Sequence, residues 1–180
     1  MLILVVGPSG AGKDTLLDAA RRALAGDPDV RFVRRVITRA AQAGGEDHEA
    51  VSDADFSARD FALHWAAHGL RYGIPADIAP DLARGAMVVA NVSRTVIADA
   101  ARRFPVRVIE ITAPPELLAA RLAARGREAK ADAAVRLSRS VALVAGVPVE
   151  TVVNDGTPED GAQRFLAALR RARSGPVAAA

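Results

Sequence analysis

The first stretch of the chain that could do chemistry is the glycine-rich segment 7–13. Gly7, Gly12 and Lys13 stand at the spacing G-x-x-x-x-G-K, which is typical of nucleotide-phosphate binding. Glycines let backbone N–H groups approach phosphate oxygens, and the N-terminus of a following helix favours anions. Lys13 is also one of only two lysines in an arginine-rich chain. The segment therefore predicts a P-loop, whereas the dinucleotide fingerprint G-x-G-x-x-G does not fit its glycines.

A P-loop needs a buried strand before it and a helix after it, and the sequence predicts both. The apolar run 2–6 is typical of a buried parallel strand, and an amphipathic helix is expected over 15–25. Further strands are predicted at 30–33, 87–90, 106–111 and 149–153. Helices are predicted at 52–68, 76–84, 95–104, 114–125, 132–144 and 158–173, with a loop at 40–51 and a short strand or turn at 70–75. This alternation favours an α/β fold with one parallel sheet flanked by helices.

Composition limits the classes of function that fit the chain. The 180 residues are 51% hydrophobic and carry a formal charge of +3, and there is no cysteine. A disulfide framework and a thiolate nucleophile are therefore excluded. We expect no nucleic-acid partner because no basic tract is present, and no membrane span because the first apolar run is too short. The expectation is one cytoplasmic domain over 1–175 with a frayed tail at 176–180, and an oligomeric state that the sequence leaves open, homodimer included.

Arginines near the end of a predicted helix could supply charge for phosphoryl transfer. Arg121 and Arg125 lie four residues apart on one helix face, and Arg127 follows Gly126. They predict a mobile lid over about 121–135 that places positive charge around a transferred phosphoryl group. A solvated helix face is an equally good interpretation of the spacing. Asn154-Asp155-Gly156 reads most simply as a turn.

Two histidines raise the question of a metal site. His64 and His68 are four residues apart on a predicted helix, a spacing that can pair on a metal ion. No third ligand stands near them, and the glutamate of H-E-x-x-H is missing. Structural or surface histidines are therefore the favoured interpretation, and Trp65 between them is expected in the core.

Several blocks, taken in order, carry a resemblance to a known family. The chain resembles nucleoside-monophosphate-kinase-type P-loop proteins, is similar to guanylate kinases, and is more closely similar to ribose 1,5-bisphosphate phosphokinases. The blocks extend from residue 2 to about 156. They are Gly10-Ala11-Gly12-Lys13-Asp14, Ile37-Thr38-Arg39, Gly45-Glu46-Asp47-His48, Ala62-Leu63-His64-Trp65 with Gly69, Tyr72-Gly73, Asn91-Val92-Ser93-Arg94, Arg125-Gly126-Arg127-Glu128 and Asn154-Asp155-Gly156.

The resemblance implies transfer of the γ-phosphoryl group of ATP to the 1-phosphate of ribose 1,5-bisphosphate. The products would be 5-phospho-α-D-ribose 1-diphosphate (PRPP) and ADP, on a route that salvages products of phosphonate breakdown. An acceptor region over about 34–85 and a lid are implied with it. A phosphate monoester, whose second pKa is about 6, is mostly ionised at neutral pH, so no general base is needed. The protein must instead cancel the repulsion between two polyanions.

The resemblance also implies roles for the residues that match the motifs of the family. The P-loop is assigned to the ATP phosphates through Gly7, Pro8, Ser9, Gly10, Ala11, Gly12, Lys13, Asp14 and Thr15. The catalytic set is Lys13, Asp14, Arg121, Arg125 and Arg127. The acceptor is assigned to Arg35, Arg39, His48, Tyr72 and Arg94, and the adenine to the neighbourhood of Asn154 and Asp155.

Asp14 departs from the usual P-loop, because it stands where a magnesium-binding Ser or Thr is expected and Thr15 comes one residue late. The predicted strand 87–90 ends in Asn91, so the acidic magnesium ligand expected there is missing too. The hypothesis is that the magnesium carboxylate has moved into the loop as Asp14, acting through water with Thr15 beside it. ATP and Mg²⁺ are accordingly the expected co-substrate and metal.

Three alternatives remain open on the sequence. Guanylate kinase activity is the nearest, but the segment after Arg39 is shorter than in that family. Gln42, His48 and Ala50 replace its second arginine and its aromatics, which favours a smaller acceptor. A non-catalytic guanylate-kinase-like interaction module would not need Lys13 and the lid arginines. Transfer to a sugar hydroxyl would need a carboxylate base, for which Glu46 or Asp47 is available.

Overall fold

The computed structural model describes residues 1–40, 46–124 and 146–175, and its centre is a parallel sheet. The strands run in the order β2-β7-β1-β8-β9, and all neighbours pair in parallel. Their bounds are β1 Leu2–Val6, β2 Val30–Phe32, β7 Met87–Asn91, β8 Val106–Thr112 and β9 Val149–Val153. Every residue of β1 is fully buried, as its unbroken apolar run predicts.

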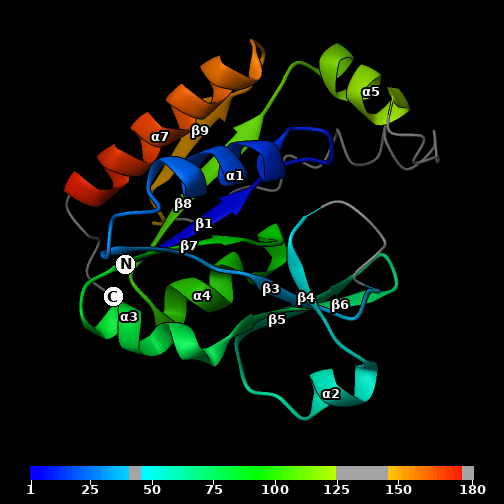
Figure 1. The fold of residues 1–180 in the computed structure, drawn as a ribbon, viewed down its shortest axis with the longest axis vertical. Coiled ribbons are helices and arrows are strands. Elements are labelled where there is room, and N and C mark those ends of the chain that lie inside the picture. The colour runs from blue at the N-terminus through cyan, green and yellow to red at the C-terminus, as the bar shows by residue number, and fades with distance from the viewer. Residues whose placement is uncertain (41–45, 125–145, 176–180) are drawn as a thin grey trace.

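Helices cover both faces of this sheet (Figure 1). On one face, Ile3 and Val5 of β1 pack with α1 (Lys13–Ala23) and α7 (Pro158–Ser174). On the other face, Leu2 and Leu4 pack with α4 (Ile97–Arg103), which follows the short helix η3 (Arg94–Val96). Alternate residues of β1 therefore belong to two separate hydrophobic clusters. The predicted α/β fold with a parallel sheet flanked by helices is confirmed.

A second, smaller sheet lies beside the first, within the region expected to bind the acceptor. Its order is β4-β3-β6-β5, with β3 and β4 parallel and the other pairs antiparallel. The bounds are β3 Arg35–Ile37, β4 His48–Ala50, β5 Phe61–Ala67 and β6 Leu70–Pro75, with α2 Asp53–Ser57 between β4 and β5. The predicted loop at 40–51 therefore contains a strand at its end. Residues 41–45 lie outside the described part of the chain.

The helix expected over 52–68 was wrong after its first turn. Ser52 caps α2 through a hydrogen bond from the Asp55 backbone N–H, but the helix ends at Ser57. Residues 61–67 form β5, which pairs with β6 so that Trp65 faces Tyr72. The turn between them uses positive φ angles, 54° at His68 and 70° at Gly69. His64 and His68 consequently lie on a strand and a turn, and the helical pairing considered for a metal does not exist.

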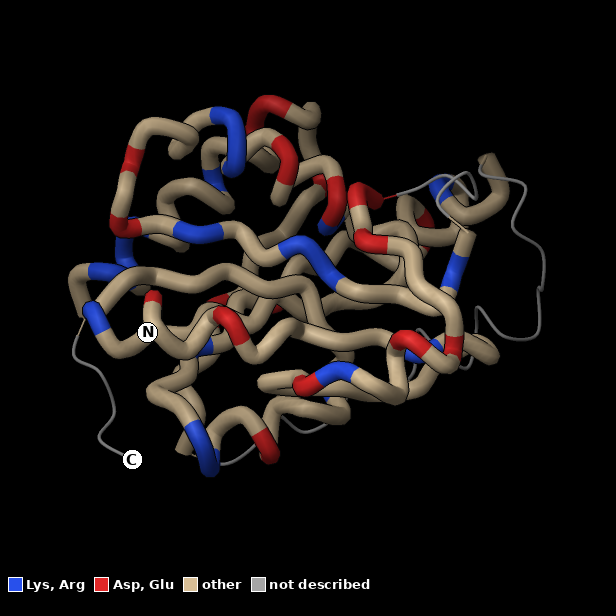
Figure 2. Tube along the Cα trace, turned by 60° about the horizontal axis from the view of Figure 1, so that its bottom comes forward, with Lys and Arg blue, Asp and Glu red and all other residues tan. Residues whose placement is uncertain are grey.

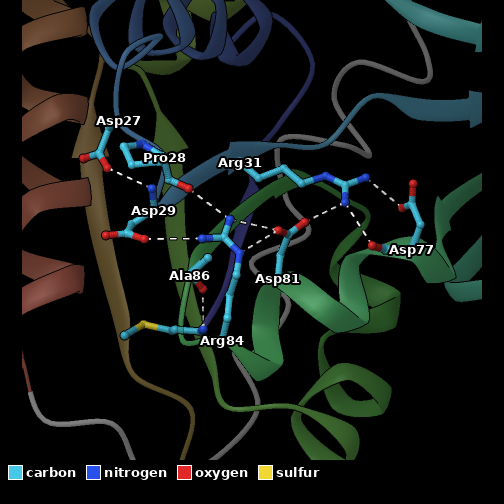
Figure 3. Close-up of polar contacts among 9 residues, drawn as sticks. Asp27, Pro28, Asp29, Arg31, Asp77, Asp81, Arg84 and Ala86 are labelled. Carbon is cyan, nitrogen blue, oxygen red and sulfur yellow. Dashed lines mark hydrogen bonds and ion pairs between the residues drawn. The ribbon is translucent and has the colours of Figure 1, made fainter.

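A network of ion pairs joins the two sheets on the side away from the glycine-rich loop. Arg31 of β2 donates to Asp77 of η2 (Ala76–Ile78) and to Asp81 of α3 (Ala79–Ala83), at 2.7 Å in both cases. Arg84 donates to the same Asp81 at 2.9 Å and to Asp29 at 3.3 Å (Figure 3). These contacts tie the segment that follows β6 to an edge of the main sheet.

Charged residues of both signs are spread along the rest of the chain. Lys and Arg are interspersed with Asp and Glu along most of the trace (Figure 2). Among the described residues, no helix is both long and apolar enough to cross a membrane. The remaining helix, α5 (Pro115–Ala124), begins with the proline that predicted its start. The helix expected at 132–144 and the tail 176–180 lie outside the described residues.

Candidate active site

The glycine-rich loop joins the end of β1 to the first turn of α1, as predicted. Gly7 has φ 148°, and a Cβ there would lie 2.0 Å from the backbone oxygen of Ile111. Gly12 has φ 88° and precedes the first residue of α1 directly. Both positions require glycine, because a side chain would clash or strain the backbone. The loop therefore presents its backbone at the N-terminus of an eleven-residue helix, where anions are favoured.

Lys13 reaches back into this loop. Its Nζ donates to the carbonyl oxygens of Gly7 at 2.9 Å and Pro8 at 3.0 Å. Burial lowers the pKa of Lys13 to about 8, Asp14 beside it raises the pKa, and the positive charges of Arg35 and Arg94 lower it. The negative charge of Glu46 raises the pKa in turn, so burial is the main cause of the lowered value. An anion bound there would favour the ammonium form and raise the pKa of Lys13.

Asp14 and Asn91 meet across the gap between the loop and the neighbouring strand. The Asn91 Nδ2 donates to Asp14 Oδ1 at 3.2 Å, and Asn91, the last residue of β7, is only 7% exposed. Thr15 is exposed on the first turn of α1. The described residues contain no group of three or more His, Cys, Asp or Glu that could hold a metal ion. Mg²⁺ is commonly bound by one or two carboxylates, with water and substrate phosphates as its other ligands, so Asp14 fits this metal.

Asn154 lies behind the loop and supports it. Its side chain is buried, and Nδ2 donates to the carbonyl oxygen of Ala11 at 2.8 Å. A Cβ on Gly12 or on Gly161 would come within 2.5 Å and 2.4 Å of the Asn154 amide, so glycines on both sides make room for it. Asp155 forms an ion pair with Arg164 at 2.6 Å. Asn154 thus contacts the P-loop backbone, a role that the turn-like sequence Asn-Asp-Gly did not reveal.

Arg121 of α5 is brought to the same corner. Its Nη1 donates to the backbone oxygen of Asn154 at 3.1 Å. The predicted lid partners Arg125 and Arg127 lie outside the described residues. Of the three arginines, the structure therefore describes one, and it places that one beside the P-loop.

Arg35 and Glu46 form a largely buried ion pair next to Asp14. The Arg35 Nε donates to Glu46 Oε2 at 2.7 Å, and the side chains are 12% and 15% exposed. The guanidinium carbon lies 5.4 Å from the ring centre of Tyr72 and 6.0 Å from that of Trp65. The two rings are parallel to within 4°. Sequence reasoning missed Glu46 and Trp65 as members of this cluster, since only the register of the β5–β6 hairpin places Trp65 against Tyr72.

Arg39 and His48 form a second pair at the end of β3. Their side chains approach within 3.4 Å, between Arg39 Nη2 and His48 Nδ1, and His48 Nε2 lies 3.3 Å from the Arg39 backbone oxygen. His48 is buried and begins β4. The Arg39 Nε is buried and has no hydrogen-bond partner among the described residues. Arg94, by contrast, forms an ion pair with Glu110 of β8.

The predicted site residues lie around the P-loop at the carboxyl end of β1, at the end of β7, and on the second sheet, where Arg35 and His48 begin β3 and β4. Residues expected to bind ATP surround the P-loop, and Arg35 and Asp14 line one cavity together with Asn91 and Glu46. A glycine-rich loop at a helix N-terminus with a half-buried lysine, and with arginines beside it, defines a P-loop kinase.

Comparisons with known proteins identify the family. A family model described as an AAA domain matches residues 2–145. Ribose 1,5-bisphosphate phosphokinase PhnN of Acidiphilium cryptum is 55% identical to the chain over 97% of its length and 95% of the relative's. The enzyme of the same name from Brucella melitensis is 49% identical, over 91% and 88%. The chain belongs to the ribose 1,5-bisphosphate phosphokinase family and is a phosphotransferase.

Solved structures agree on the fold. The structure of guanylate kinase from Anaplasma phagocytophilum matches with a TM-score of 0.70 and 21% sequence identity, over 97% of this chain and 87% of that one. A gluconokinase from Sinorhizobium meliloti matches with a TM-score of 0.53 and 18% identity, over 95% and 92%. At these identities the likeness concerns architecture alone.

Proposed function

We propose that this enzyme transfers the γ-phosphoryl group of ATP to the 1-phosphate of ribose 1,5-bisphosphate, giving PRPP and ADP. The relatives that match nearly the whole chain carry the name of this activity. We also propose a role in the salvage of phosphonate breakdown products, in the cytoplasm, where ATP is available. The observation that carries the proposal is the position of Arg35, which belongs to β3 of the second sheet and lines one cavity with Asp14 beside the P-loop.

The chemistry asks for charge and alignment rather than for a base. The acceptor phosphate is already ionised at neutral pH, so the barrier lies in bringing two polyanions together. Lys13 and Arg121 supply positive charge on the ATP side, and Arg35 and Arg39 supply it on the acceptor side. Mg²⁺, held by Asp14 through water, would neutralise charge on the ATP phosphates. Arginine forks suit the acceptor because they bind phosphate oxygens in pairs.

The aromatic pair of the second sheet supports an acceptor without a base. Trp65 and Tyr72 offer flat rings of the kind on which a nucleobase would stack. The guanidinium of Arg35 lies over both rings and is fixed there by Glu46. A base could stack on the ring faces that Arg35 covers only after displacing this cation and breaking the Arg35–Glu46 pair.

The test is a product analysis with purified enzyme, ATP and Mg²⁺. Ribose 1,5-bisphosphate, ribose 5-phosphate, gluconate and GMP are offered separately, and products are followed by ³¹P NMR and mass spectrometry. We expect a new diphosphate signal and stoichiometric ADP with the sugar bisphosphate alone. GDP as the sole product would replace the proposal by guanylate kinase activity. ATP binding without turnover of any acceptor would favour an interaction module.

A further inference from the structure

The carboxylate of Asp14 differs from the other acidic groups of its cavity. Asp18, Glu46 and Asp47 line the same cavity, and each forms an ion pair with an arginine. No lysine or arginine forms an ion pair with Asp14 in the part of the chain that the structure describes. Its neighbour Lys13 donates to the Gly7 and Pro8 carbonyls instead. Asp14 is thus a carboxylate beside the P-loop, and its side-chain hydrogen-bond partner, Asn91, is a neutral amide.

Asn91 stands where a P-loop protein usually has its second magnesium ligand. In such proteins the metal is held by a Ser or Thr after the lysine and by an acid in the Walker-B motif. Here β7 lies directly beside β1, with Val5 opposite Asn91, and it ends in an amide. The loop carries the carboxylate and the strand the neutral group. A second carboxylate 3.2 Å from Asp14 would repel it, whereas the amide donates to it.

We propose that Asn91 is a positioning residue, which holds Asp14 Oδ1 so that Oδ2 serves the magnesium that accompanies ATP. Asn91 is suited to this because it is nearly fully buried and sits on a central strand, so its amide has a fixed place. Partners of metal-ligating groups orient them, and their loss typically costs 10- to 100-fold in metal affinity. The inference rests on the proposed use of ATP with Mg²⁺, but not on the identity of the acceptor.

The test measures magnesium's effect on nucleotide binding, without an acceptor. The dissociation constant of a non-hydrolysable ATP analogue is determined by calorimetry with and without Mg²⁺. The readout is the constant without Mg²⁺ divided by the constant with Mg²⁺, which is the factor by which Mg²⁺ tightens binding. We expect Asn91→Ala to lower this ratio by about 10-fold or more while the constant without Mg²⁺ stays as in the wild type. A ratio equal to that of the wild type would overturn the proposal.

Two further variants keep the test sharp if Asn91→Ala folds poorly. Asp14→Asn should abolish most of the magnesium effect, and Asp14→Asn/Asn91→Asp, which exchanges the two groups across the same hydrogen bond, should regain part of it. A double variant no better than Asp14→Asn would also overturn the proposal. Asp18→Asn is the matched control, because it removes a carboxylate of the same cavity that is paired with Arg21, and its ratio should not change.

Failure of the Asn91 proposal can be distinguished from failure of the proposed acceptor. If the product analysis shows another acceptor, the binding ratios are unaffected because no acceptor is present. If the ratios do not respond to Asn91, the assignment of ribose 1,5-bisphosphate still stands. Melting temperatures of all variants without nucleotide show whether a lost ratio reflects lost folding.

Discussion

Burial of Lys13 disfavours the ammonium form that phosphate binding requires. The side chain is held inside the P-loop by two carbonyl oxygens, and removal from water lowers its pKa to about 8 from the ordinary 10.5. The free enzyme therefore begins to lose the ammonium charge just above physiological pH. Phosphates that bind to the loop favour the charged form, so nucleotide binding and protonation of Lys13 support each other.

The pH dependence of nucleotide capture follows from this pKa. We expect kcat/KM for ATP to fall as the pH rises through about 8, because kcat/KM reports the free enzyme. The fall in kcat itself should come at higher pH, since bound phosphates raise the pKa of Lys13. Initial rates from pH 6.5 to 10 measure both. A kcat/KM for ATP that stays level to pH 9.5 would show that the lysine is not the titrating group.

Stability offers an independent view of the same residue. Between pH 8 and 10.5 the unfolded chain holds a proton on Lys13 that the folded chain has lost, so the folded state gains stability as the pH rises. Lys13→Met removes this gain. Urea unfolding of both proteins at pH 7.5 and 10 should show the wild type improving relative to the variant.

Arg35 should act on the acceptor and not on ATP. Arg35→Ala removes a largely buried guanidinium beside Asp14, and a lost charge-assisted hydrogen bond costs about 1.5–3 kcal/mol. We expect KM for the acceptor to rise by about 10- to 100-fold with KM for ATP changed by less than about threefold. Arg59→Ala is the control, because its ion pair with Glu49 has both side chains 41% exposed. An equal effect of both changes would mean that net charge, not position, matters.

At the scale of elements, the sequence predicts what local patterns encode. The runs at 2–6 and 87–90 are strands because buried parallel strands are apolar on both faces, and 106–111 is a strand although Arg107 and Glu110 interrupt its apolar residues. The helix predicted over 52–68 was wrong in its second half, because a capping serine followed by Phe56, Phe61 and Trp65 resembles the sequence pattern of a helix. Its second half is a strand because β6 pairs with it, and a pairing partner is not visible in a local pattern. The family resemblance assigns Arg35 and Tyr72 to one site, but the place of Trp65 beside Tyr72 depends on the β5–β6 pairing and could not be predicted.

The contact of α7 with the P-loop gives a prediction at this scale. Gly161 of α7 leaves room for Asn154, and a Cβ there would lie 2.4 Å from Asn154 Oδ1 and 3.0 Å from Leu16 Cδ2. Gly→Ala inside a helix usually stabilises by about 1 kcal/mol. Gly161→Ala should instead lower the free energy of unfolding by about 1–3 kcal/mol through overpacking.

Displacement of Asn154 should also be felt at the nucleotide. The amide supports Ala11 O, so Gly161→Ala should weaken binding of ATP severalfold in the same calorimetric assay. Gly26→Ala is the control, because nothing lies within 4 Å of its Cβ. A Gly161→Ala protein as stable as the wild type, with unchanged ATP affinity, would show that the packing around Asn154 can accommodate a methyl group.

At the scale of the whole molecule, the proposed acceptor site requires the second sheet to be held at a fixed place relative to the P-loop. Arg35 of the second sheet and Asp14 of α1 line one cavity, so a shift of the second sheet relative to the main sheet and its helices would separate them. The Arg31–Asp81–Arg84 network ties the end of the second sheet to β2 of the first (Figure 3). Asp81 is the shared acceptor of both arginines.

Asp81→Asn tests whether this network stabilises the whole fold. Hydrogen bonds from Arg31 and then from Arg84 hold the pKa of Asp81 below its ordinary 3.8, so its stabilising effect is present above that pH and is lost as the pH falls through the lowered pKa. We expect the variant to melt at a lower temperature than the wild type at pH 7, and the difference to close in acid and to shrink in 1 M salt. Asp99→Asn is the control, because Asp99 pairs only within α4, with Arg102 and Arg103, among the described contacts. Equal losses in the two variants would show that joining the sheets adds nothing beyond a surface ion pair.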